Sequence, residues 1–290
     1  MIAINPSQWL VMTVFGACFG ACVGSFLNVC IYRIPLDQSV ISPRSHCMRC
    51  GKVIPWYRNL PVASYFILKG KCADCGAEFS FRYAVVELLT AGLFVVPCLQ
   101  YPPLGLSPAL GLVPLASAWM IPVVWLFLGG LIIATFVDLD HFIIPDSVTW
   151  GGMVAGLALS ALLPELHGQS IWWRGLMMSG LGLAVGFGLL ELVAVLGKLA
   201  LKKDAMGFGD VKLMGAIGAF FGWQAAIFCL IGAAFAGAFV GLVLIALRRG
   251  KIGAPIPFGP YIALAGAVWV FWGPKLMALY LSMFQGGTPQ

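Results

Sequence analysis

Residues 213–247 carry no charged side chain and read LMGAIGAFFGWQAAIFCLIGAAFAGAFVGLVLIAL. A transmembrane helix needs about 20 residues of this kind. The run is therefore too long for one untilted span, and its Gly222-Trp223-Gln224 predicts a break between a short helix at 210–222 and a longer one at 225–247. Comparable apolar runs recur along the whole chain. They indicate membrane helices, because the strands of membrane barrels alternate apolar and polar residues.

The composition of the whole chain agrees with a membrane protein. Of its 290 residues, 61% are hydrophobic and 10% are charged, and the mean hydropathy is +0.96. Soluble domains have roughly 45–50% apolar and about 25% charged residues. The composition excludes an ordinary soluble enzyme, a disordered chain and a collagen-like fibre. We expect an all-α polytopic membrane protein.

The gaps between charged residues predict about eight transmembrane helices in all. In addition to the two in the quoted region, they are 8–32, 83–100, 115–137, 147–164, 173–197 and 257–284. Residues 88–137 contain no charge, and several prolines near the middle divide this stretch into two helices. The first span lacks a basic segment before it, so we do not interpret it as a cleaved signal peptide.

The Lys and Arg residues predict the orientation, because cytoplasmic loops of membrane proteins are enriched in them. In a chain with eight spans, the loops 33–82, 198–212 and 248–251 share one side and hold 15 of the 17 basic residues. We expect these loops in the cytoplasm and both termini outside. The formal net charge of +6 follows from this bias, so we expect no nucleic-acid partner.

The first long loop contains two Cys-x-x-Cys pairs, each followed by a glycine. The four residues are Cys47, Cys50, Cys72 and Cys75. Thiolates at this spacing form a tetrahedral zinc site, and four protein ligands leave no position open for catalysis. Two disulfides or a dithiol redox pair are the alternatives, although a cytoplasmic location disfavours stable disulfides. We expect a small zinc-binding domain at 33–82 that folds around a structural metal.

Acidic side chains are few, and several lie within or at the ends of predicted spans. An ionisable group at membrane depth is costly and marks a functional site by default. Asp138 ends one span, and Asp210 closes Gly207-Phe-Gly209-Asp210 and opens another. When two carboxylates share a site, one can activate a water while the other, protonated, polarises a carbonyl. The pair points to aspartic-protease chemistry, and Gly207 and Gly209 would allow backbone to approach Asp210.

Other interpretations of the same residues stay open. The macrodipole alone favours a carboxylate such as Asp210 at a helix N-terminus. Asp146, which precedes Ser147 and Val148, has the pattern of a helix N-cap. Ion or proton translocation would use the same kind of intramembrane acid.

Six motifs, taken in order, resemble those of the bacterial type IV prepilin peptidase family, and together they cover nearly the whole chain. They are Gly24-Ser-Phe-Leu-Asn28 leading to Arg33-Ile-Pro35; the cysteine pairs with Pro55-Trp-Tyr57 and Asn59-Leu-Pro61 between them; Arg82-Tyr83 followed by Glu87-Leu; Asp138-Leu-Asp140 with Ile144-Pro145-Asp146; Gly207-Phe-Gly209-Asp210-Val-Lys212-Leu; and Pro257-Phe-Gly259-Pro260-Tyr.

The resemblance implies a bifunctional leader peptidase and N-methyltransferase of the GxGD aspartic protease class. Asp138 and Asp210 would be the catalytic pair. The supporting residues would be Asp140, Asp146, Gly207, Gly209 and Lys212. The enzyme would lie in the bacterial inner membrane and remove the basic leader of a type IV prepilin or pseudopilin at the cytoplasmic face. It would then methylate the new N-terminal residue with S-adenosylmethionine. Membrane lipid is the other expected partner.

The sequence offers no glycine-rich Rossmann turn for the methyl donor, and its soluble stretches are too short for a nucleotide-binding α/β domain. We expect the donor between the zinc loop and the membrane helices, with Glu87, Asn28 and Arg33 as candidate contacts; a purely structural role in joining helices is the alternative. The expected domains are 1–100, with the methyltransferase part, and 101–290, the peptidase.

Two further functions remain as alternatives. A GxGD protease without methylation would fit the aspartates, although the long zinc loop argues against a minimal peptidase. An ion- or proton-coupled transporter would also place acids within spans, and inverted repeats would favour it. No internal repeat is visible in the sequence.

Overall fold

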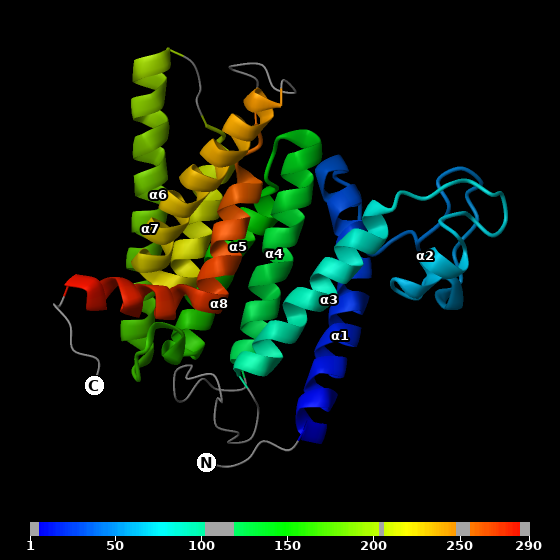
Figure 1. Ribbon diagram of the computed structural model, residues 1–290, viewed down its shortest axis with the longest axis horizontal. Coiled ribbons are helices and arrows are strands. Elements are labelled where there is room, and N and C mark those ends of the chain that lie inside the picture. Colours follow the sequence, from blue (N-terminus) through cyan, green and yellow to red (C-terminus); the bar gives the residue numbers. More distant parts are fainter. Residues whose placement is uncertain (1–5, 102–118, 203–205, 248–255, 285–290) are drawn as a thin grey trace. The chain divides into compact units, whose positions relative to one another are not determined.

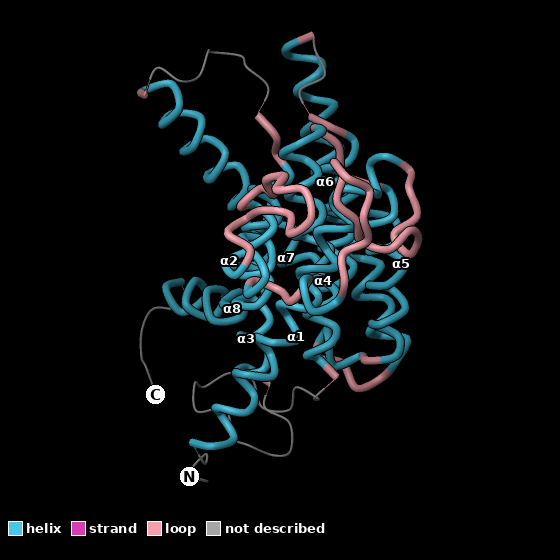
Figure 2. The backbone as a smooth tube through the Cα atoms, turned by 90° about the vertical axis from the view of Figure 1, so that its right-hand side faces the viewer, coloured by secondary structure: helices cyan, strands magenta, loops and turns pink. Residues whose placement is uncertain are grey.

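A computed structural model of the chain describes residues 6–101, 119–202, 206–247 and 256–284. Within these ranges the structure is helical and contains no β-strand, as Figure 2 shows. Six of the described helices are long and apolar enough to cross a membrane. The expected all-α membrane fold is confirmed. The chain forms two compact units, residues 1–137 and 138–290.

The first unit is built on helix α1 (Pro6–Arg33) and helix α3 (Arg82–Gln100), which pack along each other (Figure 1). Glycines spaced four residues apart on α1 allow this contact. A Cβ atom at Gly20 would lie 2.8 Å from the Cα of Ala91, and one at Gly24 would lie 2.8 Å from the Cα of Glu87. Small residues at such spacing let helix backbones approach closely in membranes.

Helix α4 (Met120–His141) begins in the first unit, and its last turn, from Asp138, belongs to the second. Trp125 stacks on Phe94 of α3 at 5.2 Å between ring centroids and donates its indole N–H to the carbonyl of that residue at 2.9 Å. The predicted helix at 115–137 is therefore present and continues one turn further. Its predicted first residues, 115–118, lie outside the described residues.

The loop between α1 and α3 contains short helical elements only. They are η1 (Ile34–Leu36), η2 (Trp56–Arg58) and α2 (Ala63–Ile67). Isolated β-bridges, His46 with Val53 and Lys71 with Glu78, close the two turns that carry the cysteine pairs. The loop therefore has little regular structure of its own, as expected for a segment that depends on a metal to fold.

The second unit surrounds helix α7. Its elements are α5 (Asp146–Leu162), η3 (Pro164–His167), α6 (Trp172–Leu201), α7 (Phe208–Ala246) and α8 (Gly259–Phe284). Helix α7 contacts α5, α6 and α8. At the α6–α7 contact the backbones touch, because a Cβ atom at Gly182 would collide with the carbonyl oxygen of Gly218. Pro274 lies inside α8, and Figure 1 shows the last part of this helix (red) turned away from the first.

The predicted break in the long apolar run is confirmed at Gly222, whose backbone is non-helical with φ 81° and ψ 179°. The carbonyl of Ala219 would ordinarily accept from the residue four positions later, beyond this break. The Ser179 hydroxyl donates to it instead, at 2.6 Å. The Ser160 hydroxyl lies 3.4 Å from the same oxygen and 2.8 Å from Nε2 of His167. Side chains of three other elements thus stabilise the interruption.

Candidate functional site

The second unit brings Asp138 and Asp210 together. Asp138 lies in the last turn of α4 and is 5% exposed; Asp210 lies in the first turn of α7 and is 7% exposed. Their side chains are close enough for their charges to interact. Residues 72 positions apart in sequence (210 minus 138) therefore place two buried carboxylates at one site. This juxtaposition is the one expected from the sequence.

The two carboxylates differ in their hydrogen-bond partners. The backbone N–H of Gly259, the first residue of α8, donates to Oδ2 of Asp138 at 2.9 Å. Asp138 therefore faces a helix N-terminus, whose partial positive charge favours an anion. Oδ1 of Asp210 is buried and has no hydrogen-bond partner within the described part of the chain. One carboxylate is anchored by backbone, and the other presents an oxygen available to a water or a substrate.

Gly259 is a residue whose role the sequence did not reveal. A Cβ atom there would lie 2.7 Å from Oδ2 of Asp138 and 3.1 Å from Cδ1 of Ile144. Only glycine lets the start of α8 approach the carboxylate this closely. The available signal was the Pro257-Phe-Gly259-Pro260 motif, but nothing in the sequence connects that motif to a residue 121 positions earlier.

Lys212 and Asp146 form an ion pair through Nζ and Oδ1. Lys212 is 7% exposed, and its ammonium also lies 5.3 Å from the ring centroid of Phe208. The N-cap of α5 is Pro145, not Asp146, which lies in the first helical turn. Asp146 therefore does not cap α5 but joins its start to the start of α7. Lys212 lies two residues after Asp210, so this pair fixes the turn that carries the second carboxylate.

The glycines before Asp210 allow close packing. A Cβ atom at Gly209 would lie 3.1 Å from the Cβ of Ile144, and one at Gly207 would lie 3.4 Å from Oδ2 of Asp210. Gly207 is the N-cap of α7. At Gly209 the group that packs closely is Ile144 of the chain itself. The approach of a substrate backbone to Asp210 stays a prediction. Asp140 is exposed at the end of α4.

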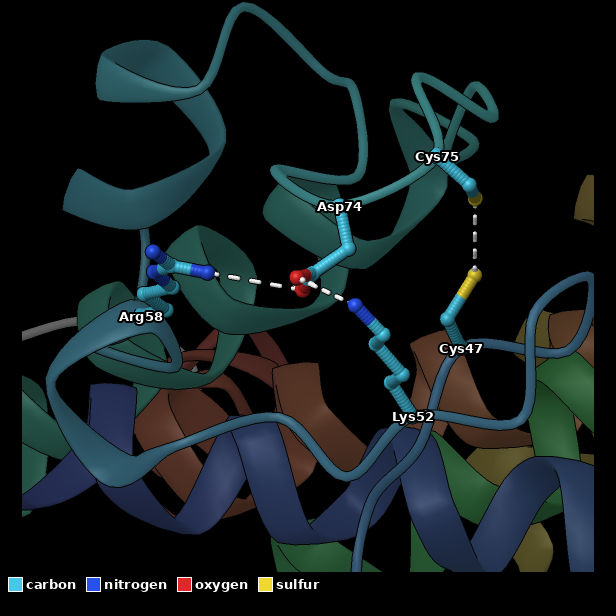
Figure 3. Close-up of polar contacts among 5 residues, drawn as sticks. All are labelled: Cys47, Lys52, Arg58, Asp74 and Cys75. Atoms are coloured by element: carbon cyan, nitrogen blue, oxygen red, sulfur yellow. Dashed lines mark hydrogen bonds and ion pairs between the residues drawn. The ribbon is translucent and has the colours of Figure 1, made fainter.

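The first unit contains the cysteine cluster. The four sulfur atoms of Cys47, Cys50, Cys72 and Cys75 all lie within 4.8 Å of one another, and those of Cys47 and Cys75 are 3.7 Å apart (Figure 3). Zinc–sulfur bonds of about 2.3 Å in a tetrahedron place the sulfurs about 3.8 Å apart. The donor set and its geometry fit zinc. No disulfide joins the cysteines of the described residues.

The two turns that carry the cysteines have the same backbone pattern. The N–H of Gly51 donates to the carbonyl of Cys47 at 2.8 Å, and the N–H of Gly76 donates to that of Cys72 at 2.9 Å. Both glycines have a φ of 69°, a conformation that favours glycine. The backbone N–H of Cys50, and then that of Arg49, hydrogen-bond the Cys47 sulfur and lower the pKa of its thiol to about 6. A thiolate is the form that binds a metal.

A cavity of about 500 Å³ lies between the cysteine loop and the ends of α1 and α3. The three candidate cofactor contacts, Asn28, Arg33 and Glu87, all line it. Arg33 donates from Nη1 to the carbonyl of Ser39 at 2.9 Å and from Nη2 to that of Pro43 at 2.8 Å. Its guanidinium therefore anchors the loop to the end of α1.

Asn28 and Glu87 also hold this cavity together. Nδ2 of Asn28 donates to the carbonyl of Tyr83 at 3.1 Å, joining α1 to α3. Oε2 of Glu87 accepts the backbone N–H of Val62 at 2.7 Å, joining α3 to the loop. The structural role that the sequence offered as an alternative is thus present. It does not exclude ligand binding, because these side chains line the cavity.

Comparison with known proteins assigns the chain to a family. The pattern described as "Bacterial Peptidase A24 N-terminal domain" matches residues 18–101, and the pattern "Type IV leader peptidase family" matches residues 125–242. A prepilin leader peptidase/N-methyltransferase of Aeromonas salmonicida is 35% identical, over 91% of this chain and 92% of that protein. The chain belongs to the type IV leader peptidase family.

Other members of the family are similar over comparable lengths. The prepilin leader peptidase/N-methyltransferase of Pseudomonas aeruginosa is 30% identical over 97% of this chain and 96% of its own length. The one of Myxococcus xanthus is 41% identical over 83% of this chain, a match that spans 65% of the relative. No solved structure matches the chain. The family and the helical spans together identify a multi-pass protein of the inner membrane.

Proposed function

We propose that this chain removes the basic leader of type IV prepilins or pseudopilins and then methylates the new N-terminal amine. Membership of the family supports these two classes of reaction. The observation that carries the site is the juxtaposition of two buried carboxylates, Asp138 and Asp210, with different hydrogen-bond environments.

The peptidase step needs a base, a water and an acid. Asp138, held by the N–H of Gly259, would act as the carboxylate that takes a proton from water. The water oxygen would attack the scissile carbonyl carbon, while a protonated Asp210 hydrogen-bonds the carbonyl oxygen. The tetrahedral intermediate would then break its C–N bond, and the leaving amine would take the proton from Asp138. The ion pair of Lys212 with Asp146 would keep the start of α7 in position, together with the glycines Gly207 and Gly209. Asp140 is the remaining supporting residue that we propose.

The methyl transfer requires S-adenosylmethionine, which supplies an electrophilic methyl group on a sulfonium. We propose zinc as a structural cofactor held by the four cysteines, because their geometry leaves no open coordination position. The methyltransferase part would lie in residues 1–100 and the peptidase in 101–290.

We further propose that the cysteine loop and the two aspartates lie on the cytoplasmic side, with both termini outside and lipid around the spans. The loop 33–82 contains eight of the 17 Lys and Arg residues, which supports this orientation. Part of the supporting charge, in residues 203–205 and 248–251, falls on segments outside the described residues.

The test is a cleavage assay with the purified full-length chain in lipid. The substrate is a prepilin with a basic leader, supplied with S-adenosylmethionine, and the readout is intact mass. We expect the wild type to remove the leader and add the mass of one methyl group. Asp138→Asn and Asp210→Asn should abolish cleavage, by a factor of at least about 10³ for loss of an essential acid or base.

Each alternative function predicts a different mass of the prepilin after the assay. Leader loss without the methyl increment would identify a protease without methylation. If every prepilin tried stays uncleaved, the proposal is wrong and the transporter alternative is favoured. Cleavage that persists in both Asn variants would place the catalytic groups elsewhere.

A further inference from the structure

The short helix α2 turns an apolar face outward. Ala63, Phe66 and Ile67 are spaced i, i+3 and i+4, so they share one face of the helix. All three are exposed, Phe66 to 58% and Ile67 to 73%. The opposite face supplies Ser64 and Leu68 to the lining of the cavity. A surface helix in water would normally bury its apolar face, so the outward face of α2 marks an interaction surface.

This apolar surface continues from α2 to the start of a membrane span. The ring centroid of Tyr65 lies 5.7 Å from that of Phe66 and 5.5 Å from that of Phe81. Phe81 is 53% exposed and directly precedes α3, whose apolar span begins at Arg82. Three aromatic rings therefore connect the outward face of α2 to the first residue of the span. We call Phe66, Ile67 and Phe81 the α2 patch.

A hydrogen bond places the start of α2 beside the span and not beyond its end. The backbone N–H of Val62, the N-cap of α2, donates to Oε2 of Glu87 at 2.7 Å. Glu87 is five residues after the first residue of α3, which corresponds to about 7.5 Å along a helix axis. The polar interface on each side of a bilayer is roughly 5–7 Å thick. Helix α2 therefore begins at the depth of this interface, and it is too short to cross the membrane.

The charge of the loop indicates which partner the α2 patch fits. Lys69 and Lys71 follow α2 and are exposed, and Lys71 pairs with Glu78 at 3.4 Å. The loop 33–82 contains eight Lys and Arg residues against three Asp and Glu residues. A zinc ion with four thiolates would subtract two charges and leave the loop positive. Such a surface attracts anionic lipid head groups and repels the basic leader of a prepilin.

We propose that the α2 patch lies in the interface of the surrounding bilayer, with its three side chains at the acyl-chain boundary and Lys69 at anionic head groups. Segments with an apolar face and a basic edge lie in this plane. The partner is a phospholipid with a negatively charged head group, such as phosphatidylglycerol. The contact holds the loop that carries the cysteine turns against the membrane beside α3. It goes beyond the proposed cleavage and methylation, and it depends on neither.

The first test is hydrogen–deuterium exchange of the full-length, zinc-loaded protein in nanodiscs. The bilayer is phosphatidylcholine alone or a mixture with phosphatidylglycerol. We expect the amides of α2 to exchange about tenfold more slowly in the mixture, because the anionic lipid holds α2 in the interface. Ile67→Glu should remove this slowing, since it places a negative charge in the apolar contact. Lys69→Gln should weaken it.

The matched control is Ile41→Glu, which should keep the slow exchange of α2. Ile41 is 88% exposed and belongs to the same loop. It lies in the stretch that Arg33 holds at the end of α1, through the carbonyls of Ser39 and Pro43. Neither Ile41 nor Ile67 lines the cavity, so zinc content and prepilin cleavage should stay at the wild-type level and report on folding.

A photo-crosslinking side chain identifies the partner directly. p-Benzoylphenylalanine replaces Ile67 or, as the control, Ile41, and the protein is irradiated in the mixed nanodiscs with prepilin present. We expect intact mass to show a phospholipid adduct at position 67 and none at position 41. An adduct of position 67 with prepilin or with a second copy of the chain, or no adduct there, would overturn the proposal. Equal exchange of α2 in the two bilayers, or equal effects of Ile67→Glu and Ile41→Glu, would overturn it as well.

Discussion

At the scale of single residues, the cysteine cluster has the most direct consequence. Two short turns supply all four thiolates, and the loop around them has little regular structure. A structural zinc contributes its binding free energy to folding. Loss of one ligand should therefore affect the loop before it affects the membrane helices.

We predict that Cys72→Ser reduces bound zinc from about one per chain to near zero, because serine replaces a thiolate ligand of the tetrahedral site. Metal analysis of the purified protein measures this. Cys18→Ser is the matched control, since Cys18 is exposed on α1, outside the cluster, and zinc should be retained. A native protein that holds no metal would contradict the prediction.

Gly259 shows how one backbone position can control a side chain far along the sequence. Its N–H is the partner of Asp138, and its missing side chain is what permits the contact. We predict that Gly259→Ala lowers the rate of prepilin cleavage about a hundredfold, because a displacement of about 1 Å at a reacting group has an effect of that size. The measurement is kcat with a saturating prepilin.

Gly188→Ala provides the comparison, because a Cβ atom there would meet no atom within 4 Å. That variant should cleave at the wild-type rate. A Gly259→Ala protein with full activity would show that the hydrogen bond to Asp138 has no role in cleavage.

At the scale of the elements, the contact between α6 and α7 depends on glycine. A Cβ atom at Gly182 would overlap the backbone of Gly218, whereas one at Gly180 on the same helix would meet nothing within 4 Å. Overpacking a helix contact costs ~1–3 kcal/mol. The contact is therefore a sensitive point of the second unit.

We predict that Gly182→Ala lowers the thermal midpoint of the protein in detergent by about 5 °C. Gly180→Ala should leave the midpoint unchanged or raise it slightly, because alanine has the better helix propensity. Equal midpoints for the two variants would show that α6 and α7 can separate at no cost. Scanning fluorimetry of both proteins gives the comparison.

Helix positions could be predicted from the sequence because charges mark the ends of membrane spans. Residues 83–100 were expected and Arg82–Gln100 is observed, and the break at Gly222 follows from its glycine. The cysteine cluster was predictable because its ligand spacing is nearly fixed. Contacts between distant segments could not be predicted from the sequence in this way. The hydrogen bond from Gly259 to Asp138 depends on packing that no local pattern encodes.

At the scale of the whole molecule, the distribution of Lys and Arg predicts how the spans are oriented in the membrane. The positive charge of the predicted cytoplasmic loops sets the expectation, and an even number of spans places both termini together. The predicted domain boundary between residues 100 and 101 stays a prediction.

We predict that alkaline phosphatase fused after Gln290 is active, because that enzyme folds only outside the cytoplasm. A fusion within the loop 33–82 should be inactive. The two fusions together measure the side of each segment. Activity of the loop fusion, or inactivity of the C-terminal one, would overturn the eight-span topology.

The cavity that residues 25–87 enclose contains no residue of the unit that holds Asp138 and Asp210. On the proposal that residues 1–100 carry the methyltransferase, a drug-like compound that occupied this cavity would block methylation and contact neither aspartate. Cells treated in this way would still trim their prepilins but export subunits with a free primary amine. The two proposed reactions would thus each be open to a selective inhibitor of its own.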